Sequence, residues 1–132
     1  VQRVWTFDET KGTDACVVEF GPAPGLRFEG TRQDQWVIEA RLHSIYNAAT
    51  EYQAGLTVNN LGMALKADSE CRALIDALAE EIEEDLGIPF DQAHAWLMAY
   101  RSERCREVRK LYDDFFLQLD KLDNEQLAEK PA

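Results

Sequence analysis

The chain has 132 residues, a mass of 15.1 kDa and a formal net charge of −11 at pH 7, with 45% hydrophobic and 30% charged residues. These values are typical of one soluble globular domain, and no apolar run is long enough for a transmembrane helix or a signal peptide. The excess of carboxylates also works against duplex nucleic acid or an anionic membrane as the main ligand. We therefore expect the partner to be another protein.

The cysteines and histidines indicate neither a disulfide framework nor a metal site. Cys16, Cys71 and Cys105 are an odd set without a C-x-x-C motif, so we expect reduced thiols and a cytoplasmic location. His43 and His94 are the two histidines, and no short ligand spacing surrounds them. We therefore expect no metal and no cofactor.

The N-terminal residues have strand character. Residues 3–7 and 15–20 are β-branched and aromatic runs, and the polar segment 8–14 between them reads as a hairpin turn rather than a calcium loop. After a break at 21–25, residues 26–29 alternate in polarity. The pattern predicts an antiparallel meander of two or three strands that must pack on helices.

Helical spacing begins after this meander. Thr31, with Asp34 three residues later, signals the start of a helix over about 32–53 that ends near Gly55. A weaker, shorter helix is predicted over 58–66, where Asn59, Asn60 and Gly62 lower the propensity.

Two further helices follow, joined by a short connection. Asp68 or Ser69 would cap a helix over 69–86 that stops at Gly87, and Asp91 would cap a long helix over 92–122. A connection this short favours an antiparallel hairpin. The fold class is thus α+β and mainly α, with a small N-terminal sheet on three to four helices. We expect one domain over 1–122, made of segments 1–30, 31–67 and 68–122, and a frayed polar tail over 123–132.

The negative charge is concentrated in one predicted helix. Residues 68–100 hold nine acidic residues and one basic residue. In the hairpin the end of that helix lies level with about 92–98, where no fixed positive charge occurs, so the run should stay largely unpaired. The candidate partner-binding residues are Asp76, Glu80, Glu81, Glu83, Glu84 and Asp85.

Three classes of function follow from these features. The first is a non-enzymatic inhibitor or adaptor of the immunity, anti-defence or nucleic-acid-mimic type, docking a basic protein such as a nuclease through the acidic helix. The second is a structural or assembly protein, chaperone-like or of phage morphogenesis, with mainly apolar contacts and a merely solubilising acidic run. The third is a small enzyme with a pocket near His43 or His94. Arginines around Cys105 could favour a thiolate, but His94 lies about 16 Å away along the same helix.

The last predicted helix is long for a domain of this size. Residues 92–122 would span about 46 Å, whereas the domain should be roughly 36 Å across. Either the helix breaks within 101–107, or about 10 Å of it projects. A projecting stripe would favour a homodimer, unless the sheet or the helix over 32–53 covers it. The candidate self-association residues are Leu111, Phe115, Leu119 and Leu122. We expect most other aromatic residues, including Trp36, in the core.

Overall fold

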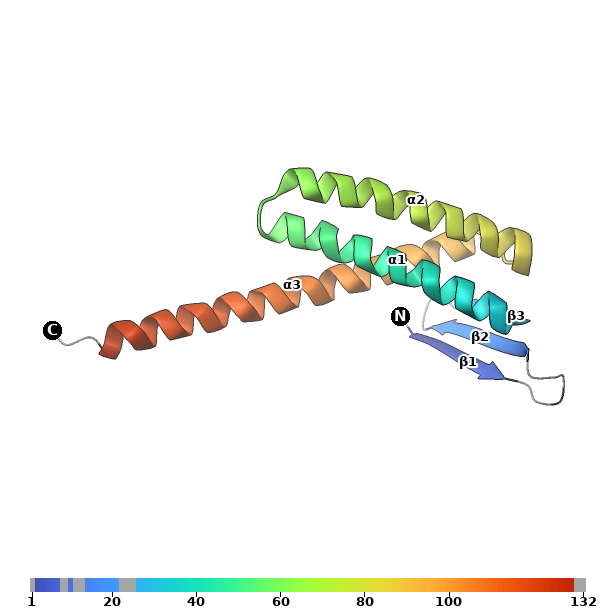
Figure 1. Ribbon diagram of the computed structural model, residues 1–132, viewed down its shortest axis with the longest axis horizontal. Helices are drawn as coiled ribbons and strands as arrows, with labels where there is room; N and C mark the ends of the chain where they lie inside the picture. The colour runs from blue at the N-terminus through green and yellow to red at the C-terminus, as the bar shows by residue number, and fades with distance from the viewer. Residues whose placement is uncertain (1, 8–9, 11–13, 22–25, 130–132) are drawn as a thin grey trace.

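The computed structural model describes residues 2–7, 10, 14–21 and 26–129 (Figure 1). The predicted meander is confirmed as a three-stranded antiparallel sheet in the order β1-β2-β3. Its strands are β1 (Gln2–Phe7), β2 (Ala15–Gly21) and β3 (Leu26–Thr31). The expected turn over 8–14 and break over 21–25 fall largely outside the described residues.

The sheet is fastened to the first helix, α1 (Arg32–Thr57), by packing and polar contacts. Val18 on β2 is fully buried. From β1, Arg3 Nε and Trp5 Nε1 both donate to Glu39 Oε1, at 2.6 and 2.7 Å. Thr31 and Asp34 form the predicted capping box, which starts α1 directly at the end of β3.

The turn between α1 and α2 (Leu61–Leu86) differs from the prediction. Gly55 does not end α1: it is buried inside the helix, where a Cβ would lie 2.9 Å from the backbone nitrogen of Ala64. The glycine therefore permits close approach of the two helices. The chain reverses at Asn59, whose φ is 59°, and Asn60 caps α2 by accepting from Met63 N at 3.2 Å.

Two predicted boundaries are wrong as a consequence. No separate helix spans 58–66, because those residues form the turn and the first part of α2. Asp68 and Ser69 lie inside α2, since Asn60 already provides a cap upstream. The predicted stop at Gly87 is confirmed by its left-handed φ of 71°.

The core lies where α1, α2 and α3 (Phe90–Glu129) meet beneath the sheet. Leu42, Ile45, Ile75, Trp96 and Leu97 are among its fully buried side chains. Trp36, expected in the core, is 66% exposed. It follows Arg32 by one turn and lies about 200° around the helix from Ile38, which begins the buried stripe of α1.

The last helix is continuous and leaves the body of the protein (Figure 1). It ends at Glu129 rather than Leu122, so the segment expected to be a frayed tail is helical to that residue. Val108 is the last buried residue, and beyond half-buried Tyr112 every described side chain is exposed. We call residues 109–129 the arm. At 1.5 Å per residue the arm is about 30 Å long, three times the expected projection.

Candidate protein-docking surfaces

Some carboxylates at the acidic end of α2 have partners within the fold. Glu81 pairs with Arg41 of α1 at 3.2 Å, and Asp76 pairs with His94 of α3 at 3.2 Å. Glu83 Oε2 accepts from the backbone nitrogen of Phe90 at 2.5 Å and so caps α3. Within the hairpin of α2 and α3 the run 80–85 was expected to stay largely unpaired; its ion pair at Glu81 is made to α1, and Asp76, which pairs with His94, lies outside that run.

The remaining three candidates, Glu80, Glu84 and Asp85, are exposed, and no ion pair joins them to any other described residue. Their carboxylates lie at the negative end of the α2 dipole, which does not stabilise them. Asp85 also lines a concave surface. Of the predicted acidic set, Asp85 thus best fits a contact with a cation from outside.

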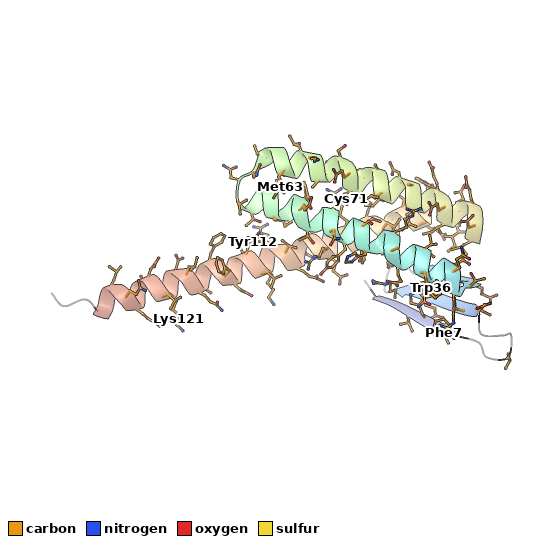
Figure 2. The ribbon with its side chains drawn as sticks, viewed as in Figure 1. Phe7, Trp36, Met63, Cys71, Tyr112 and Lys121 are labelled. Carbon is orange, nitrogen blue, oxygen red and sulfur yellow. The ribbon has the colours of Figure 1, made fainter. Side chains whose placement is uncertain are left out.

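That concave surface is a groove of about 240 Å³ between the start of α1 and the end of α2. Its walls combine carboxylates with apolar side chains, and they include Asp34, Val37, Ile38, Leu78, Glu81, Ile82, Asp85 and Leu86. Val37 is 41% exposed, and Trp36 beside it lies near the start of α1 and is 66% exposed (Figure 2). No local sequence pattern predicts this groove, because it joins segments about forty or more positions apart.

The arm carries the predicted self-association residues, and all four are exposed. The exposed fractions are 62% for Leu111, 54% for Phe115, 41% for Leu119 and 54% for Leu122. Large exposed apolar side chains that follow one another along a helix usually mark an interaction surface. The structure thus leaves this stripe available to a partner.

Two aromatic residues that the prediction omitted extend this stripe. Phe116 is 44% exposed, and its ring lies 5.8 Å from that of Phe115 and 6.2 Å from that of Tyr112. The i, i+4 spacing of Tyr112 and Phe116 was a signal that could have found them. The apolar face of the arm is therefore broader than the four predicted residues.

The root of the arm is anchored in the body by Arg101. Its side chain is 7% exposed, pairs with Asp68 of α2 and lies over the Tyr52 ring at 4.7 Å. The hydrogen bond from Arg101, with help from Arg72, lowers the pKa of Asp68 below its usual range. Arg101 thus acts inside the fold, whereas Arg106, Arg109 and Lys110 farther along the same helix are exposed.

A polar pocket of about 380 Å³ opens beside His43, between the sheet, α1 and α3. Its lining includes Arg3, Glu39, Tyr100 and Arg104. Burial opposes ionisation of Glu39, but hydrogen bonds from Arg3 and Trp5 outweigh it and lower the pKa. Burial raises the pKa of Tyr100. The ionised carboxylate and neutral phenol suit internal pairing, and the alternative of an enzyme at His43 stays a prediction.

The three cysteines are free thiols in buried or half-buried positions. Cys16, Cys71 and Cys105 each lie against a backbone carbonyl oxygen, those of Thr31, Ile45 and Ala49. Burial raises the pKa of Cys105, and this effect outweighs Arg101 and the neighbouring arginines, which favour the thiolate. Its arginine-rich sequence context therefore does not lower the pKa of Cys105.

No cluster of His, Cys, Asp and Glu side chains with the makings of a metal site occurs in the described ranges. Within the described residues, no helix is both long enough and apolar enough to cross a bilayer. Comparisons with protein-family models, with curated proteins and with solved structures find no match.

Proposed function

We propose that the chain is a non-enzymatic, cytoplasmic assembly protein that joins its partner through the apolar stripe of the arm. One observation carries this proposal: a continuous helix extends about 30 Å beyond the body and keeps its large apolar side chains exposed. The three free thiols accord with a reducing compartment.

The exposure of the arm is costly unless a partner covers it. Removing the exposed surface of a half-exposed Leu or Phe from water contributes on the order of 1 kcal/mol. Phe115, Phe116, Leu119 and Leu122 together therefore contribute on the order of 4 kcal/mol, and the apolar surface that a partner buries against them must add to this to offset the entropic cost of binding. An isolated helix of this length is also only marginally stable in water, so packing against a partner would stabilise it.

Site-specific photo-crosslinking tests the proposal in the cells that produce the chain. A photoreactive phenylalanine analogue at Leu119 should form adducts with another polypeptide, of whatever identity. The same analogue at Asn124, on the opposite face of the arm, is the matched control and should form few. Equal yields at the two positions, or none at either, would contradict docking through the stripe.

The groove between α1 and α2 favours a second candidate function, the docking of a basic protein. A Lys or Arg side chain from a partner could lay its aliphatic stem on Val37 and Ile82 while its cationic head meets Asp85. Trp36, which precedes the groove residue Val37 and is 66% exposed, is the residue type that often dominates binding energy at protein interfaces. In this hypothesis the protein acts as an inhibitor or adaptor, and ionic steering makes association slower as salt rises.

An arginine- and lysine-rich peptide serves as the probe for this second candidate. Asp85→Lys should weaken its binding at least about tenfold, a loss of about 1.4 kcal/mol. Glu70→Lys makes the same change of net charge about four turns away from Asp85 on α2 and should weaken binding much less. Equal losses in the two variants would show non-specific attraction to an acidic protein and would contradict a site in the groove.

A further inference from the structure

The apolar stripe of the arm has the spacing of a two-helix coiled coil. Tyr112, Phe115, Leu119 and Leu122 follow one another at intervals of three, four and three residues. The same stripe begins inside the body, where Val108 is 3% exposed. The apolar stripe that is packed inside the body at Val108 thus continues along the arm into solvent. One more helix, packed against the arm, would cover it.

Charge is distributed unevenly along the arm. Its root is basic, with Arg109 and Lys110 next to Arg106, while residues 113–129 hold six acidic residues and one lysine. Two parallel arms would place acidic ends side by side, whereas two antiparallel arms would place each acidic end beside a basic root. Charge complementarity therefore favours a second copy of this chain in the antiparallel direction.

We propose that two copies pair through antiparallel arms, with Tyr112 opposite Leu122 of the other copy and Phe115 opposite Leu119. This inference rests on the proposed function and names the partner of that same surface. In an antiparallel coiled coil the first position of the heptad on one helix lies opposite the fourth position on the other. In this register each of the four pairs of facing residues along the contact is therefore apolar. A two-fold axis then passes near Leu117, and the contact closes on itself.

The same register places charges and aromatic rings favourably at the edge of the seam. On their shared edge, Arg109 of each copy lies within two residues of the level of Asp123 of the other, giving two opposite-charge contacts. Phe116 of one copy lies near Phe116 of the other copy, close to the two-fold axis. Because the two bodies lie at opposite ends of the paired arms, their acidic surfaces are kept apart.

The body offers a further contact for the end of the partner's arm. The turn between α1 and α2 lies at the end of the body from which the arm departs (Figure 1). Its exposed apolar side chains are Leu56, Val58, Leu61 and Leu65. In the proposed register the last turns of the partner's arm, with Leu127, end at this side of the body.

Sedimentation equilibrium of the whole chain tests the pairing. At tens of micromolar we expect twice the mass of 15.1 kDa. Phe115→Asp together with Leu119→Asp should raise the dissociation constant at least about 100-fold and give the monomer mass. Leu117→Asp, on the opposite face of the arm, should leave the dimer within about threefold of its original affinity. A monomeric wild-type chain, or equal effects of the two changes, would overturn the pairing.

Disulfide trapping tests the direction. An oxidised mixture of the Tyr112→Cys and Leu122→Cys chains should give a cross-linked dimer, whereas each variant alone should give little. Cross-linking of each variant alone would indicate parallel arms and overturn the proposal. The photo-crosslink at Leu119 separates this inference from the proposed function: adducts with a different polypeptide and a monomeric pure chain would refute self-pairing while leaving the docking role of the arm in place.

Discussion

The two halves of α3 have similar apolar content but opposite environments. In residues 90–108 the apolar side chains meet α1 and α2, and Trp96 and Leu97 are at most 1% exposed. In the arm, side chains of the same kind face solvent, and Phe115 and Leu122 are each 54% exposed. An amphipathic helix therefore does not by itself reveal which half packs within the chain and which half awaits a partner.

The boundary between the halves is set by the length of the neighbouring helices. α1 ends at Thr57 and α2 begins at Leu61, so their turn marks the limit of the body. Arg101 and Val108 pack on this side of the limit, and no packed residue follows Tyr112 in the described arm. The arm projects because α3 extends beyond the ends of α1 and α2, the helices that could cover it.

The largest expected effect contrasts one aromatic residue from each half. Trp96→Ala should lower the free energy of unfolding by about 3–5 kcal/mol, because it leaves a cavity in the core. Phe115→Ala should change the unfolding of the monomeric body by less than about 0.5 kcal/mol. Urea unfolding at concentrations where the arm is unpaired measures both, and comparable losses would show that the arm belongs to the cooperative body.

A smaller effect tests the turn that limits the body. Gly55→Ala should destabilise the fold by about 1–3 kcal/mol, since the added methyl group would press on the backbone of Ala64. Gly62→Ala is the matched control, because its nearest neighbour is a side-chain oxygen at 3.8 Å. That variant should be neutral or more stable by about 0.5 kcal/mol. Thermal unfolding that ranks the two variants in the reverse order would contradict close packing at Gly55.

The ion pair between Arg101 and Asp68, which holds α3 to α2 before the arm begins, should make the free energy of unfolding depend on pH. Because folding lowers the pKa of Asp68, its stabilising effect is present above the ordinary value near 3.9 and is lost as the pH falls through the lowered folded value. Asp68→Asn should therefore lower the free energy of unfolding at pH 6. It should also make that free energy fall less as the pH is lowered. In an Arg101→Met background the same change should have little effect on the pH profile, and an undiminished effect would rule out this pair as the cause.

Local sequence signals were sufficient for the start of α1 and the end of α2, but not for where α2 begins or for the neighbours of each element in space. The capping box at Thr31 and the stop at Gly87 were readable because each depends on residues within one turn. Gly55 was misread because a glycine that ends a helix and a glycine that admits a second helix look alike in sequence. The groove at Asp85 and the partners of Asp76, Glu81 and Glu83 depend on tertiary contacts, which local spacing does not contain.

Hydrogen exchange followed by mass spectrometry tests the central claim, that the arm lies outside the body and is completed by a partner. Peptides covering 111–127 should exchange rapidly in dilute solution and become protected as the protein concentration rises through the dissociation constant of the dimer. Peptides covering 93–101 should be protected equally at both concentrations. Protection of the arm that does not depend on concentration would contradict the account, as would an arm that exchanges rapidly even in concentrated solution.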